Sequence, residues 1–360
     1  MKTNNVKVLL NAAVVLLIAW ALVACSKKDA TPPVVKTDLT ASITTANALV
    51  LSTHEGVAAG NYLKGSQAPL IAAIAQAQVV ADDTNATQVQ VTAAIANLAA
   101  ALATYSNALV TPIDPTNLVG QWTFDEITTA AANAVVKDYS GNTHDGTLKA
   151  GDAHWAGTGV PTLAADRYGI TGKALHFDKG QNVEIPYATS LNPQMMSVSL
   201  WAKQDVETAL FADQYMVSMN RWNGYKFQFQ GTPQPFFTAR AARSPGDTTI
   251  YDHDAGLGSA PLTQGTWYHV VATFGAGHEI FYVNGVQTID WGTGTNAATP
   301  GTVISLAAKP VNLIFGQDLP TGGYDADFGG YFHGTLDEIR IYKSVLTQAQ
   351  VTSIYNLEKP

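Results

Sequence analysis

Cysteine and charged residues are both scarce in this sequence of 360 residues. The one cysteine, Cys25, leaves no disulfide bond within a monomer. Charged residues make up 13% of the chain, and the formal net charge is -8, which gives no electrostatic attraction for nucleic acid or anionic membrane surfaces. The sequence also lacks a Gly-x-Ser-x-Gly elbow, a His-Glu-x-x-His motif and a phosphate loop. These absences argue against several common enzyme classes.

The N-terminus contains the longest apolar run of the chain. Two lysines precede residues 8–24, and the run ends in Leu-Val-Ala-Cys at residues 22–25. This length and flank predict an export signal over residues 1–24 rather than a membrane span. The ending resembles the lipobox of bacterial lipoproteins, and the resemblance implies cleavage before Cys25 and acylation of its sulfur. We therefore expect a lipid anchor in the bacterial cell envelope, with the outer membrane as the expected site.

Residues 25–37 and 38–110 differ from the rest of the chain in composition. The first stretch is polar and contains a proline pair, as a tether would. The second is rich in alanine, its apolar residues recur at helical spacing, and Thr87-x-x-Gln90 predicts a capping box, so we expect a small three-helix bundle. The segment resembles FIVAR-type helical modules, on the Glu55-Gly56 turn and the sequences around residues 73–77 and 85–87. That resemblance implies a spacer or a sugar-binding accessory role.

From residue 118 onward the apolar pattern changes to a period of two. Strands are predicted at 197–202, 225–229, 267–274, 311–315 and 336–342, among others. Asn284-Gly285 between alternating apolar runs predicts a type I′ hairpin. Many strands with glycine-rich turns and no alternating helices favour a mainly β, antiparallel sandwich.

Residues 117–358 resemble the LamG-like jelly roll of the concanavalin A-like lectin/glucanase superfamily. Seven sequence blocks carry the resemblance in family order: Gly120–Glu126, Val136–Gly146, Gly172–Phe177, Met196–Trp201, Gly265–Val270, Tyr282–Gly285 and Gly334–Tyr342. Trp122, Trp201 and Trp267 are expected to fill the space between the two sheets. His176 and His269, which have apolar neighbours, are expected to be structural residues.

The superfamily resemblance also implies a calcium ion between the first and last strands. The matching acids are Asp125 and Asp337, and the turn residues Asp138 and Asn142 offer further oxygen ligands. The alternative is that Asp337 only bonds turn amides and that Asp138 caps a turn. A second acidic loop, Tyr324-Asp-Ala-Asp327, could also bind a cation.

A sugar-binding site needs an accessible aromatic ring with polar neighbours. The candidates are loop residues, and the preferred platform is Arg221-Trp222-Asn223 with Tyr225 close by, since Gly224 would leave the indole accessible. Trp291 and Tyr324 are further candidates. A tryptophan packed over the sheet edge is the alternative for Trp222.

The sequence gives little support for catalysis. Retaining glucanases place two carboxylates about 5 Å apart, and in this superfamily they lie on one strand as Glu-x-Asp-x-x-Glu, a string that does not occur here. Asp337 and Glu338 are adjacent, so they should point to opposite faces of a regular strand.

The sequence therefore predicts a non-catalytic, lipid-anchored envelope protein that binds a glycan or polysaccharide, with a protein of a glycan-uptake system as a further partner. A calcium-dependent adhesion or protein-interaction module and a glycan-cleaving enzyme remain as alternatives.

Overall fold

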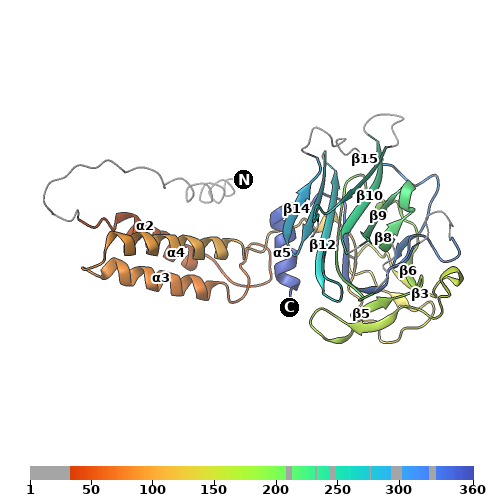
Figure 1. Ribbon diagram of the computed structural model, residues 1–360, viewed down its shortest axis with the longest axis horizontal. Coiled ribbons are helices and arrows are strands. Elements are labelled where there is room, and N and C mark those ends of the chain that lie inside the picture. The colour runs from red at the N-terminus through yellow and green to blue at the C-terminus, as the bar shows by residue number, and fades with distance from the viewer. Residues whose placement is uncertain are drawn as a thin grey trace. The chain divides into compact units, whose positions relative to one another are not determined.

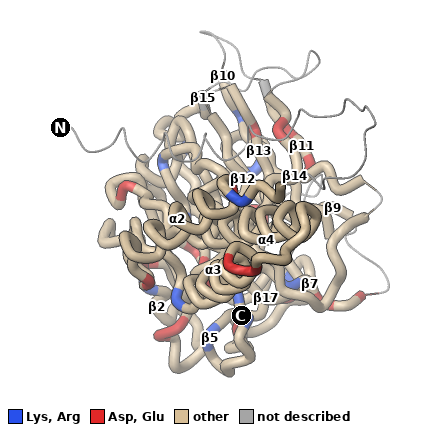
Figure 2. Tube along the Cα trace, turned by 90° about the vertical axis from the view of Figure 1, so that its left-hand side faces the viewer, with Lys and Arg blue, Asp and Glu red and all other residues tan. Residues whose placement is uncertain are grey.

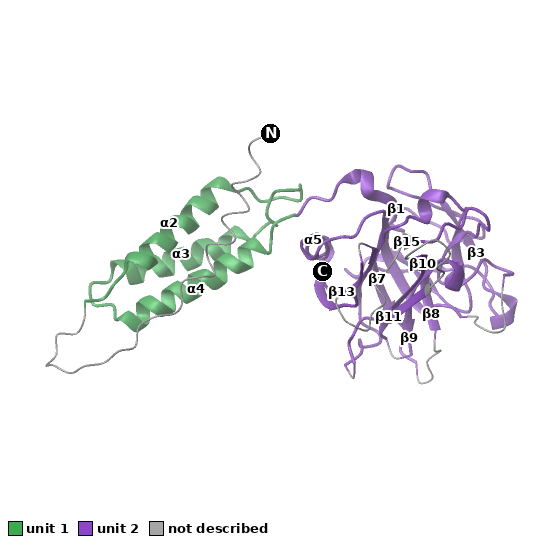
Figure 3. Ribbon diagram, turned by 90° about the horizontal axis from the view of Figure 1, so that it is seen from above, with its two compact units in different colours: residues 1–110 green, residues 111–360 purple. Residues whose placement is uncertain are grey.

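A computed structural model describes residues 33–207, 213–231, 233–242, 249–258, 260–275, 277–292, 302–323 and 330–360. The chain divides into two compact units, residues 1–110 and 111–360 (Figure 3). The first unit is helical and the second is a β-sandwich, so the predicted mainly β class is confirmed (Figure 1).

The helical unit consists of α2 (Thr37–Ser52), α3 (Gln67–Asp82) and α4 (Gln88–Ser106). One apolar stripe per helix is buried, as the helical spacing predicted; the stripes include Leu39, Ile74 and Leu98. The predicted capping box is present, because the Thr87 side chain accepts from the Gln90 N–H and the Gln90 side chain accepts from the Thr87 N–H. By length and composition alone, α4 is the one helix in the described chain that could cross a membrane.

Two antiparallel sheets form the sandwich. The first has the order β14 (Val286–Asp290), β13 (His278–Val283), β12 (Tyr268–Gly275), β7 (Met196–Gln204), β17 (Gly334–Tyr342), β5 (Thr171–Phe177) and β4 (Thr162–Ala165), and β1 (Leu118–Trp122) also pairs with β17. We call it the eight-stranded sheet.

The second sheet, called the nine-stranded sheet, faces the first. Its order is β11 (Thr249–Asp254), β10 (Pro235–Ala242), β9 (Tyr225–Gln230), β8 (Asp213–Met219), β16 (Leu313–Phe315), β6 (Asn182–Ile185), β3 (Gly146–Lys149) and β2 (Val135–Val136), and β15 (Thr302–Val303) pairs with β10. Charged residues are sparse along the Cα trace of both units (Figure 2).

The apolar core lies between the two sheets, and Trp122 is buried in it. Its indole contacts Phe315 edge-on at 5.0 Å and its Nε1–H donates to the His144 carbonyl at 2.9 Å. The placement predicted for Trp122 is therefore confirmed.

Trp201 and Trp267 do not lie between the sheets, so the prediction for these two residues was wrong. Leu200 and Ala202 of β7 face the core, and strand alternation therefore turns Trp201 to the outer face of its sheet. There it meets the C-terminal helix α5 (Gln348–Glu358), whose Tyr355 ring lies 5.8 Å from the indole. Figure 1 shows α5 beside the sheet that contains β12 and β14. Trp267 is half-buried, with Lys203 Nζ 5.3 Å from its ring.

A buried ionic network joins α5 to the outer face of the eight-stranded sheet. Arg340 of β17 forms ion pairs with Glu358 and Glu338, and the Nε1–H of Trp201 donates to Glu358 at 2.9 Å. On the same face, Arg167 lies 2.5 Å from Asp337 and 3.7 Å from Glu338. Removal of one partner from a buried ion pair of this kind lowers the free energy of unfolding strongly, because the other charge stays buried without a partner.

Asp337 and Glu338 therefore lie toward the same arginine, which contradicts the prediction that they face opposite sides. The strand register shifts between Asp337 and Arg340, and Glu338 has a φ of 51°. A β-bulge of this type re-aims side chains, so simple alternation fails at this point. By contrast, Asn284 and Gly285 have φ values of 50° and 77°, so both central residues of the β13–β14 hairpin have the positive φ that the predicted type I′ turn requires.

We expect Arg340→Met to destabilise the sandwich by about 3–5 kcal/mol, because it leaves two buried carboxylates without their cation. Urea unfolding of the chain from residue 25 onward, followed by tryptophan fluorescence, measures this unit alone, since the first tryptophan after Cys25 is Trp122. The matched control is Lys137→Met, which removes a surface ion pair whose side chains are 50% and 36% exposed; we expect a change of no more than about 1 kcal/mol. Equal effects of the two substitutions would contradict the role given to the network.

Candidate functional site

The candidate site is built on a turn that connects β8 and β9. Residues Arg221–Asn223 form one 3-10 turn. Asn220, just before the turn, has a φ of 57°, and Arg221, its first residue, has a φ of 24°. A Cβ atom on Gly224 would lie 2.1 Å from the carbonyl oxygen of Met219. Only glycine fits there, so the backbone closes tightly and holds Trp222 in one place. Positive φ at non-glycine residues is costly and is retained where the surroundings enforce it.

Trp222 lies over a buried lysine of the neighbouring strand. Lys226 of β9 lies between the core residues Tyr225 and Phe227, so its side chain faces the outside of the sheet. It is nevertheless only 1% exposed, and its Nζ lies 3.9 Å from the Trp222 ring centroid and 5.0 Å from that of Tyr215. An ammonium between two aromatic faces is stabilised by cation–π attraction. Burial lowers the pKa of Lys226 to about 8.

An ion pair holds the base of the turn. Arg221 Nη1 lies 3.0 Å from Asp318 Oδ2, with side-chain exposures of 6% and 1%. Ser218 Oγ donates to the Asp318 carbonyl at 2.8 Å. Burial raises the pKa of Asp318 to about 6, against the opposing effect of the Arg221 guanidinium. Arg221 is thus a structural residue of the turn.

Polar side chains continue along the outer face of the nine-stranded sheet. Lys226 pairs in register with Thr238, and Thr238 with Asp252. Next to this row, Gln228 Nε2 donates to Asp213 at 2.7 Å. Gln228 Oε1 and Thr238 Oγ1 are buried and have no hydrogen-bond partner within the described structure. Such buried, unsatisfied polar atoms are rare in folded proteins and need an explanation.

Asn223 completes the exposed part of the turn. Its side chain is exposed, and its Oδ1 accepts from Arg240 Nη1 at 2.8 Å. Trp222 itself is half-buried. A flat indole edged by an amide and a guanidinium can contact a ligand that has both apolar faces and hydroxyl groups. We call the residues Trp222, Asn223, Lys226, Gln228, Thr238 and Arg240 the outer-face site.

The structure separates the other sequence candidates from this site. Tyr225 is buried in the core and donates from its hydroxyl to the Leu191 carbonyl at 2.7 Å, so the prediction of an accessible ligand-binding residue was wrong. Arg221 is buried in its ion pair. Trp291 is half-buried, stacks on His253 at 4.8 Å and donates to the Asp254 carbonyl. Tyr324 lies outside the described residues.

The residues proposed for calcium do not form one site. The carboxylate of Asp138 accepts four hydrogen bonds of 2.8–2.9 Å from neighbouring N–H and O–H donors. Asn142 Nδ2 donates to the Leu118 and Val119 carbonyls. Both side chains thus support a turn, which is the alternative given above for Asp138.

Asp125 and Asp337 lie beside cationic side chains. Asp337 pairs with Arg167, and the Asp125 carbonyl accepts from Lys173 Nζ at 2.7 Å. Burial raises the pKa of Asp337, against the pull of Arg167. With lysine and arginine already present, this donor set does not fit a calcium ion. Calcium binding elsewhere in the chain stays a prediction.

Sequence reasoning missed the residues that support Trp222. The alternation in residues 225–229 already placed Lys226 and Gln228 on the face opposite the core. The partners Tyr215 and Asp318 come from distant positions and could not be paired with them from the sequence. His176 was expected to be merely structural, but it lies 2.9 Å from Asp205 in a group with His333.

Comparison with known proteins agrees with this fold. A laminin G family model, described as the Concanavalin A-like lectin/glucanases superfamily, matches residues 177–352. It supports the laminin G-like jelly roll. No curated protein matches the sequence.

Solved structures resemble the chain at low identity. One is domain 4 of AbnA, a GH43 extracellular arabinanase from Geobacillus stearothermophilus, in complex with arabinotriose: 20% identity, TM-score 0.44, covering 66% of this chain and 98% of that chain. Another is the binding domain of Paraclostridial Mosquitocidal Protein 1: 15% identity, TM-score 0.45, covering 68% and 52%. A third is the receptor binding domain of botulinum neurotoxin mosaic serotype C/D: 12% identity, TM-score 0.47, covering 68% and 51%. The chain spans about half the length of the two toxin domains.

Lys226 makes the stability of the sandwich depend on pH. Its folded pKa of about 8 lies below the ordinary value of 10.5, so between these values the unfolded chain holds a proton that the folded chain has lost, and stability rises with pH. Lys226→Met should remove this rise, which is on the order of 3 kcal/mol across the interval. Urea unfolding at pH 7 to 10 measures it. Lys203→Met, the control with a lysine near Trp267, should keep the rise; a rise of equal size in Lys226→Met would contradict the assignment.

Proposed function

We propose that this protein is a non-catalytic, lipid-anchored carbohydrate-binding protein of the bacterial cell envelope, and that its glycan binds at the outer-face site. The observation that carries the proposal is the position of Trp222. A tight turn holds its indole over the Lys226 ammonium, 3.9 Å from the ring centroid, beside polar atoms that lack partners.

The chemistry of these groups suits a sugar. A pyranose or furanose ring presents C–H groups on its faces, which pack on the electron-rich face or edge of an indole. Its hydroxyl groups are both donors and acceptors, so they can pair with the exposed Asn223 amide and the half-buried Arg240 guanidinium. A rigid ring loses little conformational entropy on binding, because Trp222 is already fixed.

The surroundings of the indole favour a chain of sugars over a small charged ligand. Asn223 is exposed and Arg240 half-buried beside Trp222, and Asp252 lies two strands away in the same sheet row as Lys226. Side chains of both charges thus lie on the sheet face that carries Trp222. The superfamily match, which names lectins and glucanases, supports a ligand of this class.

The carboxylates of the sandwich support the non-catalytic part of the proposal. Asp337 and Glu338 both lie against Arg167, and Glu279 is buried against His253 at 2.9 Å. An acid–base pair for glycoside cleavage needs two carboxyl groups open to one sugar ring. These three carboxyl groups are paired with arginine or histidine instead.

The N-terminal features provide the anchor and the spacing in this proposal. Acylated Cys25 would insert in the membrane, and two or three acyl chains suffice for stable attachment. The polar tether and the helical unit then lie between the lipid and the sandwich in the chain. A neighbouring glycan-uptake protein is the partner we expect for such an anchored binder.

We expect Trp222→Ala to abolish retention of the protein in affinity electrophoresis on the polysaccharide that binds it, found from a panel of plant and host glycans. The loss should exceed about tenfold, because the substitution removes the stacking surface. Trp267→Ala is the matched control, since this half-buried tryptophan also has a lysine near its ring but directly precedes β12 of the other sheet. The control should bind normally, and neither protein should release reducing ends. Binding that survives Trp222→Ala, or sugar release, would contradict the proposal.

Cys25→Ser should prevent incorporation of labelled palmitate into the protein. Lipid-dependent attachment to the membrane fraction should be lost as well. The thiol is the acylation site in the proposed lipobox, and serine cannot form the thioether. The test is fractionation with radiolabel or mass detection in the same cells. Palmitate incorporation into the Cys25→Ser protein would rule out this anchor.

A further inference from the structure

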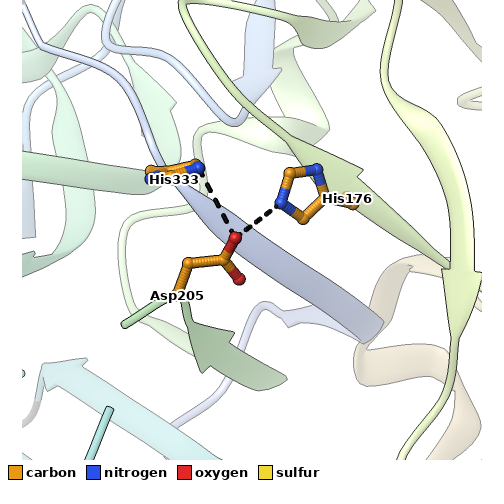
Figure 4. Close-up of side chains that lie close together, drawn as sticks. All are labelled: His176, Asp205 and His333. Carbon is orange, nitrogen blue, oxygen red and sulfur yellow. Dashed lines mark hydrogen bonds and ion pairs between the residues drawn. The ribbon is translucent and has the colours of Figure 1, made fainter. Parts of the chain in front are cut away.

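A second cluster of functional side chains lies on the eight-stranded sheet. His176 belongs to β5, Asp205 follows β7, and His333 immediately precedes β17 (Figure 4). β17 lies between the other two strands in the sheet, so their ends are neighbours. The Asp205 N–H also donates to the His333 carbonyl at 3.1 Å. This hydrogen bond extends the pairing of β7 with β17 by one residue. Three adjacent strands therefore set the positions of the cluster.

The potential ligand atoms converge on one point. Asp205 Oδ2 lies 2.9 Å from His176 Nε2 and 3.4 Å from His333 Nε2, and all three atoms lie within 4.8 Å of one another (Figure 4). Ligands of a tetrahedral zinc ion, at about 2.0–2.1 Å from the metal, are about 3.3 Å apart. Asp178 Oδ1 lies 3.9 Å from His333 Nε2, the nitrogen that is also near Asp205.

Glu207 orients His333. Its carboxylate contacts Nδ1 of His333, so this nitrogen carries the hydrogen and donates to it. In the neutral ring the lone pair is then on Nε2, the nitrogen that faces Asp205 and Asp178. A carboxylate–histidine pair with the other ring nitrogen directed to a shared point is the usual arrangement behind a metal-bound histidine.

The charge of the cluster calls for a cation. Asp178, Asp205 and Glu207 contribute three carboxylates, against two imidazoles. The ammonium of the neighbouring Lys203 lies near the Trp267 ring. It therefore attracts the Asp205 carboxylate only from a distance. A lone pair on His333 Nε2 that faces carboxylate oxygens is repelled by them, and either a proton on this nitrogen or a metal ion bound between the groups removes the repulsion.

A buried glutamine holds the backbone of His333. Gln214 is fully buried, and its Oε1 accepts from the His333 N–H at 3.4 Å. The backbone position of this histidine is therefore set by β8 as well as by the pairing with Asp205.

We infer that His176 Nε2, Asp205 Oδ2 and His333 Nε2 form a binding site for a zinc-like divalent transition metal, with Asp178 or water as the fourth ligand. Imidazole nitrogens select zinc and related ions over calcium, which prefers six or more oxygen ligands. The three side chains are 28%, 33% and 23% exposed, so an ion can enter from solvent. The bound ion would tie the ends of three strands together. This site does not depend on the glycan proposal.

The test is titration of the EDTA-treated full-length protein with Zn²⁺ in isothermal calorimetry, together with thermal unfolding with and without the ion. We expect one Zn²⁺ per chain, a melting temperature raised by several degrees, and no binding of Ca²⁺. Glu207→Gln should weaken Zn²⁺ binding by about 10–100-fold, and His176→Gln or His333→Gln should weaken it further. Circular dichroism checks that each variant is folded.

His278→Gln is the matched control. His278 also pairs with an aspartate at 2.9 Å, Asp290, but belongs to no group of three such side chains in the described chain. It should leave Zn²⁺ binding unchanged. As a measurement that needs no variant, Co²⁺ added to the wild-type protein should give visible absorption bands that Zn²⁺ removes. Absence of Zn²⁺ binding, absence of these bands, or Zn²⁺ binding that persists in both His176→Gln and His333→Gln would overturn the inference.

Discussion

The central strands of both sheets are buried on both faces, and this double burial governs the rest of the sandwich. β7, β9 and β17 carry core residues on one face, and polar or charged residues on the other face are almost as inaccessible. A buried polar group is costly unless it finds a partner inside the molecule. The outer faces therefore carry matched groups: Arg340 with Glu358, and Lys226 with two aromatic rings.

The two outer faces satisfy this requirement in different ways. On the eight-stranded sheet, α5 supplies partners through Glu358, which pairs with Arg340 and accepts from Trp201. On the nine-stranded sheet, the turn that holds Trp222 supplies the aromatic partner of Lys226. Buried polar atoms without a partner occur on both faces, for example Asp337 Oδ1 on the first and Gln228 Oε1 on the second. The feature that distinguishes the nine-stranded face is therefore the half-buried Trp222 ring beside the exposed Asn223.

Local features of the sandwich and the bundle could be predicted because neighbouring residues decide them. The Thr87–Gln90 capping box and the Asn284-Gly285 turn depend on a few consecutive positions, and both formed as predicted. The predicted face of Trp201 was wrong, because strand alternation assigns residues to two faces but does not show which face packs against the other sheet. Asp337 and Glu338 were misplaced because a bulge, which no motif announced, breaks the alternation between them.

The sequence by itself determined the fold class, the helical module and the hairpin, because apolar periodicity, caps and turn residues act over short distances. It also pointed to Trp222 as a loop tryptophan beside a required glycine. Only the tertiary structure decided that Tyr225 faces the core, that Lys226 and Tyr215 lie together, and that His176 meets His333. Those contacts join strands that are far apart in the chain, and their register is set by the packing of the whole sandwich rather than by local pattern.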